Sequence, residues 1–427
     1  MTDNSSGLAL GIDVGTSGVR TAVVDRSGKV VSTAKAAHLA TSNEDASAWW
    51  DAVARALNAQ VQQLRSLGIA PHRIGRAAVD GTSGSMVLVD GQLMPVTRAL
   101  MYNTSGFSEE GKSIDRFAEP TSITRGSSSA LARMLRLQAL DQNGEATHLL
   151  HQADFITAKL AGQSLGSDDN NALKLGWDPA SRAWPNWFEE LGVSMPLLPK
   201  VHPTGSAIGA INAEIASRFD LSPDLQLHAG TTDSIAAFLA SGASEVGDAV
   251  TSLGTTLAIK LLSDKRIDDP ASGVYSHRVG DSWLAGGASN TGGGVLVSFF
   301  TSDQLAALSR QIDPASPSEF DYYPLLKPGE RFPINDPQLE PRLQPRPQND
   351  ADFLKGILEG IARIEAVGYG RLVELGSPAP RRVFTAGGGA KNPVWAAMRQ
   401  RHLNTPVIQA DEAEASVGVA RLCWRTT

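Results

Sequence analysis

Short apolar runs that end in glycine, aspartate or serine dominate the N-terminal part of the chain and are typical of β-strands. We expect strands at residues 8–13, 19–24, 28–36 and 75–80. The next pattern is helical, because apolar side chains recur at spacings of three and four from about Ala48 to Leu67. Similar helical patterns lie around residues 129–142, 154–161 and 212–219. Strand and helix signals that alternate in this way predict an α/β fold.

The second half of the chain continues this alternation. We expect a strand, a loop and a helix in residues 227–243, a strand pair within 249–262, a helix at 350–375 and a strand at 381–386, then a further helix and a helical tail from about residue 412. Residues 314–347 contain nine prolines and little periodicity, which predicts an irregular segment packed on its domain. Residues 167–187, with three tryptophans among turn formers, predict either an ordered loop or a plain surface loop.

The same strand–turn–strand motif occurs twice in the chain. Residues 8–24 (LALGIDVGTSGVRTAVV) and 249–262 (AVTSLGTTLAIKLL) each place a Gly-Thr turn between two apolar strands. Glycine in such a turn lets backbone N–H groups, with a threonine hydroxyl, approach phosphate oxygens. The turns at Gly15-Thr16 and Gly254-Thr255 are 239 positions apart (254 − 15). We therefore predict two similar halves that face one nucleotide across a cleft.

Length and composition limit the class of protein. A chain of 427 residues predicts two domains of about 200 residues each, which we place at 1–240 and 241–412, with a C-terminal helix at 413–427 that packs back on the first. The net charge of −7, without a stretch of basic residues, argues against nucleic acid as a partner. We expect a monomer or homodimer.

The single cysteine, Cys423, excludes an intramolecular disulfide and favours a reducing compartment. The polar start MTDNSSG does not resemble a secretory leader, and no apolar run approaches the ~20 residues of a membrane span. We therefore expect a cytoplasmic protein without a membrane partner. A plastid location would require that a transit peptide has been removed.

Two aspartates are candidates for chemistry. Asp13 ends the first strand beside the Gly-Thr turn, where a carboxylate suits Mg²⁺ held through water; the alternative is that it only begins a turn. The second hairpin favours the metal role. Asp233 follows Gly-Thr-Thr at a strand end and precedes a helix, so it is either a helix cap or the general base of a phosphoryl transfer. The surrounding glycines and threonines favour the base.

Glycine clusters and a serine complete the candidate set. In TAGGGAKNPVW (385–395), Gly387 to Gly389 would let an adenine lie against backbone, with Asn392 and Trp395 beside it; a plain strand-to-helix turn is the alternative. The cluster GGASNTGGG (286–294) is less specific. Neither is a Walker loop or a dinucleotide fingerprint. Ser83, in the segment AAVDGTSGSMVLVD, either presents a hydroxyl to a polyol or lies in a simple hairpin turn. The pair His148 and His151 alone makes no metal site.

With these motifs in order, the chain resembles the FGGY carbohydrate kinases over nearly its full length. GIDVGTSGVRTAVVD, AGTTDSIAAFLASGA, VTSLGTT and TAGGGAKNPVW match their two phosphate hairpins, catalytic segment and adenosine motif, and QADFITAKLAGQSLGSDDNNALKLGWD is similar to a further series. The resemblance implies a two-domain, actin-like ATPase (ribonuclease H-like) α/β fold with a central cleft, an ATP-dependent kinase with Mg²⁺, and Asp233 as base. It implies sugar or metal contacts at Asp13, Ser17, Gly18, Ser83 and Asp233, and nucleotide contacts at Thr16, Gly254, Thr255, Gly388, Gly389, Asn392 and Trp395.

Two departures change the expected substrate. Many members read Ser-Gly-Gln-Met/Gln-His-Gly where this chain has Gly81 to Ser85, and Trp-x-Asp-x-Arg where it has Met101 to Ser105. We therefore expect the residues of the sugar pocket to differ from those of these members. The short chain with DGTSG and ALKLG resembles a compact branch of cyanobacteria and plants, which implies a ketopentose, D-ribulose first. D-Xylulose, L-ribulose, glycerol and a degenerate ATPase or regulatory protein remain alternatives.

Overall fold

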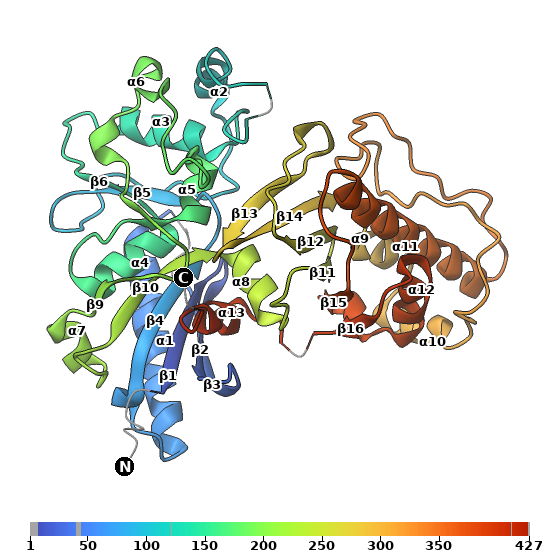
Figure 1. Ribbon diagram of the computed structural model, residues 1–427, viewed down its shortest axis with the longest axis horizontal. Helices are drawn as coiled ribbons and strands as arrows, with labels where there is room; N and C mark the ends of the chain where they lie inside the picture. Colours follow the sequence, from blue (N-terminus) through green and yellow to red (C-terminus); the bar gives the residue numbers. More distant parts are fainter. Residues whose placement is uncertain (1–6, 40–43, 121, 411, 426–427) are drawn as a thin grey trace. The chain divides into compact units, whose positions relative to one another are not determined.

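The chain forms two compact units. The computed structural model describes residues 7–39, 44–120, 122–410 and 412–425 (Figure 1). Unit 1 comprises Met1–Ala240 with Glu414–Thr427, and unit 2 comprises Ser241–Ala413. The polar start that we compared with a leader lies in residues 1–6, outside the described residues.

A six-stranded sheet forms the centre of unit 1, in the order β3-β2-β1-β4-β10-β9. The strands are β1 (Leu8–Val14), β2 (Gly18–Asp25), β3 (Val30–Ala37), β4 (Ile74–Gly81), β9 (Ala207–Ala210) and β10 (Gln226–Thr232). The first four predicted strands are therefore confirmed. β1 and β2 form an antiparallel hairpin, while β1, β4 and β10 run parallel, so their carboxyl ends meet at one edge.

Helices cover this sheet on both sides. α1 (Ala46–Ser66) and α4 (Gln152–Ala161) share a core with alternate residues of β1, including Leu10 and Ile12. α1 begins two residues before its predicted start because Asp45 accepts a hydrogen bond from the Ser47 N–H as the cap. α13 (Ala415–Leu422), the predicted helical tail, packs against α8 (Asp233–Ala240) and β1 (Figure 1). The approach is so close that a Cβ on Gly418 would lie 1.7 Å from the Ala236 carbonyl oxygen.

A second, smaller core lies among α2 (Ser108–Ile114), α3 (Ala130–Leu140), α6 (Phe188–Leu191), β5 (Met86–Val89) and β6 (His148–His151). The other elements of unit 1 are β7 (Ser167–Asp168), β8 (Val201–His202), α5 (Asp169–Leu175), α7 (Ala213–Arg218) and the short 3₁₀ turns η1 (Pro71–Arg73) and η2 (Met195–Leu197). Of these, α7 packs on the core of the six-stranded sheet through Ala216. One of the two alternatives for Ser83 is excluded here, and one prediction is wrong. β5 pairs with β6 and not with β4, so Ser83 does not lie in a hairpin turn. Residues 167–175 form β7 and α5 rather than a loop, because the Asp168 side chain caps α5.

Unit 2 repeats five strands of the unit 1 sheet and adds its sixth strand at the opposite edge. Its six strands lie in the order β13-β14-β12-β11-β15-β16. They are β11 (Asp248–Leu253), β12 (Leu257–Ser263), β13 (Tyr275–Val279), β14 (Ser282–Ser289), β15 (Arg382–Ala386) and β16 (Val407–Gln409). β11 and β12 form an antiparallel hairpin, while β11, β15 and β16 run parallel. The predicted repeat of the hairpin is confirmed, and it extends to the parallel strands beside it.

The helices of unit 2 are α9 (Gly293–Phe299), α10 (Ser302–Ser309), α11 (Asp350–Glu374) and α12 (Pro393–Leu403), with 3₁₀ turns η3 (Pro270–Ser272) and η4 (Gly388–Lys391). The proline-rich segment 314–347 contains no helix or strand of the described chain, as predicted. Glu330 fixes it to the sheet, because this buried carboxylate accepts hydrogen bonds from Ser289 Oγ (2.5 Å) and the Asn290 N–H (2.7 Å).

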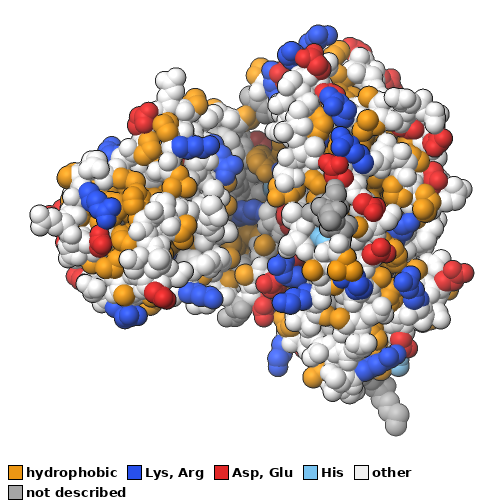
Figure 2. Space-filling model, turned by 180° about the vertical axis from the view of Figure 1, so that it is seen from behind, with side chains coloured by type: hydrophobic (Ala, Val, Ile, Leu, Met, Phe, Trp, Pro, Cys, Tyr) orange, Lys and Arg blue, Asp and Glu red, His pale blue; other side chains and the backbone are white. Residues whose placement is uncertain are grey.

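Acidic and basic side chains are interspersed over the face drawn in Figure 2, so that face presents no continuous basic area. Among the described residues, none of the helices combines the length and apolarity that a membrane crossing requires.

Candidate active-site residues in the two units

Three carboxylates gather where the parallel strands of unit 1 end. Asp13 on β1 and Asp80 on β4 are partners in the strand register, and Thr231 on β10 is the next partner in the row. Asp233 follows two residues later as the first residue of α8. The sequence prediction named Asp13 and Asp233 and missed Asp80. The signal for Asp80 resembles that for Asp13, because each aspartate lies near the end of an apolar run and a glycine follows within two residues.

Asp13 and Asp80 are buried, Asp233 is partly exposed, and the three lie in an acidic environment. Burial raises the pKa of Asp13 from 3.8 to about 6; the positive charge of Arg20 opposes this, and the negative charge of Asp233 adds to it. Arg20 Nη1 lies 3.4 Å from Asp13 Oδ2 and its Nε lies 3.2 Å from Glu414. Burial, followed by the charges of Asp13 and Asp233, raises the pKa of Asp80 well above its ordinary value. Such a concentration of like charge opposes folding and is typical of a functional site.

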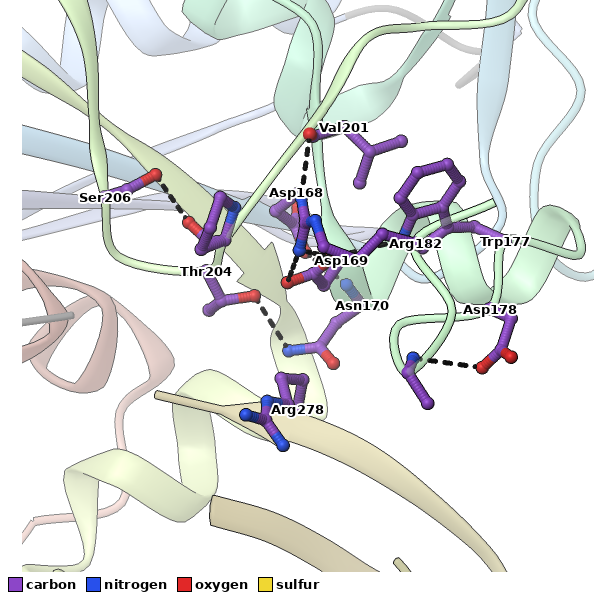
Figure 3. Close-up of polar contacts among 12 residues, drawn as sticks. Asp168, Asp169, Asn170, Trp177, Asp178, Arg182, Val201, Thr204, Ser206 and Arg278 are labelled. Atoms are coloured by element: carbon purple, nitrogen blue, oxygen red, sulfur yellow. Dashed lines mark hydrogen bonds and ion pairs between the residues drawn. The ribbon is translucent and has the colours of Figure 1, made fainter. Parts of the chain in front are cut away.

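A polar network fixes the end of β10, which Asp233 follows directly. Figure 3 shows part of this network, the contact of Asn170 with Thr204. Asn170 Nδ2 donates to Thr231 Oγ1 (3.0 Å) and to Thr204 Oγ1 (3.3 Å). Asn170 is held in turn because its backbone N–H donates to Asp168 Oδ1 at 2.8 Å. The segment that we interpreted as a loop is therefore a support for the strand that precedes Asp233.

The other predicted residues of unit 1 lie around the same strand ends. Thr16 and Ser17 are exposed in the β1–β2 turn, and Gly18 begins β2. The turn closes through the Gly15 N–H, which donates to the Gly18 carbonyl oxygen at 3.0 Å. Ser83 lies in the segment after β4, and its Oγ is buried without a hydrogen-bond partner among the described residues.

The side chains of this site fit a magnesium ion only if a single carboxylate holds it through water. Mg²⁺ binds one or two carboxylates and keeps several waters or phosphate oxygens. No group of three or more His, Cys, Asp or Glu side chains within the described ranges is arranged to hold a metal. Asp13, a strand-end carboxylate beside the Gly-Thr turn, fits the role of a single carboxylate that holds the ion through water.

Unit 2 contains a cavity of about 870 Å³ next to its own Gly-Thr turn. Its lining includes all the residues of this unit that the sequence analysis assigned to the nucleotide: Gly254, Thr255, Gly388, Gly389, Asn392 and Trp395. Leu253, Leu296, Val297 and Leu305 supply apolar surface, and Arg310 and Lys391 are the cationic lining residues. A mostly apolar cavity with a few polar groups suits a flat heterocycle with a charged extension.

The backbone at this cavity requires glycine at one point. Gly387 has φ of +86°, and a Cβ there would lie 2.6 Å from the Leu253 carbonyl oxygen. Asn392 caps α12, because its Oδ1 accepts from the Val394 N–H (3.1 Å) and the Trp395 N–H (3.2 Å). The buried Trp395 donates its indole N–H to the Leu358 carbonyl oxygen (3.1 Å). The indole N–H of Trp395 is therefore already paired within the protein, which leaves its ring for contact with a ligand.

A buried ion pair connects the strands that lead to these loops. Arg399 on α12 donates to both carboxylate oxygens of Glu365 on α11, each at 2.6 Å, and to Thr385 Oγ1 on β15 at 2.7 Å. Glu365 also accepts from Thr251 Oγ1 on β11 at 2.5 Å. β11 ends at the Gly-Thr turn and β15 ends at the glycine cluster. This network therefore fixes the strands that carry both loops.

The raised pKa of Asp13 predicts a pH-dependent cost in stability. We expect Asp13→Asn, in metal-free buffer with EDTA, to be more stable than the wild type at pH 7.5 by on the order of 3 kcal/mol. Between pH 3.8 and about 6 the native state binds more protons at Asp13 than the unfolded state, so wild-type stability falls as pH rises through this window. Urea unfolding of both proteins at pH 4 and 7.5 measures the difference, which should nearly vanish at pH 4. A wild type that is the more stable protein at pH 7.5 would contradict the assignment.

Comparison with known proteins agrees with these features. The models of the N-terminal and C-terminal domains of the FGGY family of carbohydrate kinases match residues 8–240 and 249–426. The chain is 24% identical to xylulose kinase of Escherichia coli (strain K12) over 420 residues, which cover 92% of this chain and 84% of the relative.

Solved structures show the same fold at lower identity. Xylulose kinase from Rhodospirillum rubrum aligns with a TM-score of 0.83 at 22% identity over 97% of this chain and 89% of the other. Plasmodium falciparum glycerol kinase with ADP aligns with a TM-score of 0.81 at 14% identity over 97% and 88%. The predicted α/β, two-domain, actin-like ATPase fold is therefore confirmed. The chain belongs to the FGGY family of carbohydrate kinases and is an ATP-dependent sugar kinase.

Proposed function

We propose that this kinase transfers the γ-phosphoryl group of ATP to the terminal hydroxyl of a ketopentose, with D-ribulose as the first candidate and Asp233 as the general base. The observation that carries the proposal is the placement of Asp233 at the first turn of α8, beside Asp13 and Asp80. Phosphoryl transfer needs a group that accepts the proton of the attacking hydroxyl, and otherwise depends on positioning and electrostatics.

Each unit has its own part in this proposal. Unit 1 would bind the acceptor through Asp13, Ser17, Gly18, Ser83 and Asp233. Unit 2 would bind the nucleotide in its cavity, with Gly388, Gly389, Asn392 and Trp395 around the adenosine. Thr16 of unit 1 and Gly254 and Thr255 of unit 2 would donate to phosphate oxygens. This division is supported by the positions of the residues, because the carboxylates lie at the strand ends of unit 1 and the cavity lies in unit 2.

Asp13 would hold magnesium through water in the working enzyme. Such an ion, when bound, offsets negative charge on the phosphates. Asp13 itself contributes a carboxylate that is fixed by burial and by Arg20. A carboxylate fixed in this way keeps its position whether or not the acceptor is present, which favours the alignment of the reacting groups.

A second candidate acceptor is xylulose. The observation in its favour is that curated relatives spanning over 90% of this chain are named xylulose kinases. Ribulose and xylulose differ only in the configuration of one hydroxyl. The preference for one sugar over the other therefore depends on the side chains that surround that hydroxyl. Glycerol kinase shares the fold at 14% identity, which shows that the fold alone does not choose the acceptor.

A substrate panel tests the proposal directly. We expect ADP release from ATP and Mg²⁺ by the purified protein to rise strongly with one pentulose among D-ribulose, L-ribulose and D-xylulose, and less with glycerol. The measurement is a coupled ADP assay with each sugar and without sugar. Equal ADP release in every reaction would instead indicate a degenerate ATPase and would reject the proposed transfer.

A further inference from the structure

Several buried polar groups at the end of β4 have no hydrogen-bond partner among the described residues. They are both carboxylate oxygens of Asp80, Ser83 Oγ, Gln152 Nε2 and Thr232 Oγ1. These groups belong to one neighbourhood: Thr232 pairs with Gly81 in the sheet, and Gln152 Oε1 accepts from the Thr82 N–H at 2.9 Å. Folded proteins rarely leave buried polar groups unpaired, so their concentration at one strand end points to a ligand.

Asp80 is not a requirement of the sheet in which it lies. Its side chain is 0% exposed, and no N–H or hydroxyl group of the described chain donates to it; its one polar neighbour of this kind is the Asp13 carboxyl group. A hydrogen bond between Asp80 and Asp13, its register partner, would require a proton on one of the two carboxyl groups. The duplicate sheet of unit 2 tests whether the fold needs this pair, because Ser252 precedes its Gly-Thr turn as Asp13 precedes the first, and pairs with Ala386. The same topology thus forms without either carboxylate.

Gln152 presents a donor at the same place. It is the first residue of α4, and its side chain is 1% exposed. The orientation of its amide is fixed, because the Thr82 N–H can only donate and therefore requires the oxygen, Oε1, to face it. Thr82 Oγ1 also lies 2.7 Å from that oxygen. The Nε2 group consequently points away from Thr82 and keeps its N–H groups for another acceptor.

We propose that Asp80 and Gln152 bind hydroxyl groups of the acceptor sugar and determine which sugar is phosphorylated, an inference that rests on the proposed kinase function. Asp80 accepts a hydrogen bond from one sugar hydroxyl, and Gln152 Nε2 donates to a sugar oxygen. A polyhydroxy acceptor satisfies both, since each hydroxyl is donor and acceptor. A fixed acceptor beside a fixed donor also distinguishes epimers, because moving one hydroxyl leaves one buried group unpaired.

The test compares Asp80→Asn and Gln152→Met with the wild type in the full chain. We expect the KM for the preferred pentulose to rise roughly 10- to 100-fold for Asp80→Asn and about 3- to 10-fold for Gln152→Met. The KM for ATP should stay within about twofold of the wild type, because the nucleotide cavity lies in unit 2. The ratio of kcat/KM between D-ribulose and D-xylulose should move towards one in both variants.

Gln60→Met is the matched control. Gln60 is a buried glutamine of the same unit, but its amide is paired with Thr21 Oγ1 (2.9 Å) and Ser32 Oγ (2.5 Å). This variant should lose stability in urea unfolding and keep the sugar KM and the ratio between the two pentuloses. The control thus separates damage to the fold of unit 1 from loss of a sugar contact.

Three outcomes of these assays are distinguishable. A changed sugar KM and a changed ratio in Asp80→Asn and Gln152→Met, but not in Gln60→Met, support the inference. An active wild type whose sugar KM and ratio survive both substitutions overturns the inference alone, and Asp80 then acts only through Asp13. A wild type that phosphorylates no sugar removes the proposed function, and the inference with it.

Discussion

Replacing Asp233 with asparagine is expected to lower kcat by roughly 10²- to 10⁴-fold, the range that a positioned general base contributes. Asparagine keeps the shape of the side chain but cannot accept the proton of the sugar hydroxyl at neutral pH. The KM for ATP should change little, because all residues that line the nucleotide cavity belong to unit 2. Steady-state assays with the preferred sugar measure kcat, and binding of an ATP analogue measures the retained nucleotide site.

Asp352→Asn is the control for this prediction. Asp352 also lies in the first turn of a helix, α11, and is exposed. If Asp233 were only a first-turn carboxylate that stabilises its helix, both variants would lose a little stability and keep their turnover. Turnover that remains unchanged in Asp233→Asn would therefore assign Asp233 to the helix and not to the chemistry.

The second large effect concerns stability and comes from the buried ion pair of unit 2. Arg399→Leu should lower the free energy of unfolding of this unit by about 3–5 kcal/mol, because it leaves the Glu365 carboxylate buried without its partner. Arg399 and Glu365 are 1% and 0% exposed, so water does not replace the lost contact. Urea unfolding and hydrogen exchange of β11 and β15 measure the loss.

Two further variants show whether this loss comes from an unpaired charge. Arg346→Leu removes an exposed pair with Asp350 and should change stability by less than about 0.5–1 kcal/mol. The double variant Arg399→Leu with Glu365→Leu should recover part of the loss, since no buried charge is left without a partner. A double variant as unstable as the sum of its two single variants would show that packing, and not charge, dominates.

The local patterns predicted much of the fold because they are properties of short segments. Short apolar runs and the turn at Gly15-Thr16 specify β1 and β2 without reference to the rest of the chain. The error at residues 167–175 has a local cause as well. The Asp168 cap that makes α5 competes with the turn propensity of the surrounding Ser, Asp and Asn residues, and sequence patterns do not rank the two.

The sequence by itself determined the repeated hairpins, the α/β alternation and the aspartates that end strands. Strand period, turn chemistry and residue type are all properties of short segments of the chain. Only the tertiary structure decided which of these groups meet. The register of β1 on β4 places Asp13 beside Asp80, 67 positions further along the chain (80 − 13), and the packing of α4 turns the Gln152 amide onto Thr82. Such pairings depend on contacts between distant segments, whose energies no local pattern contains.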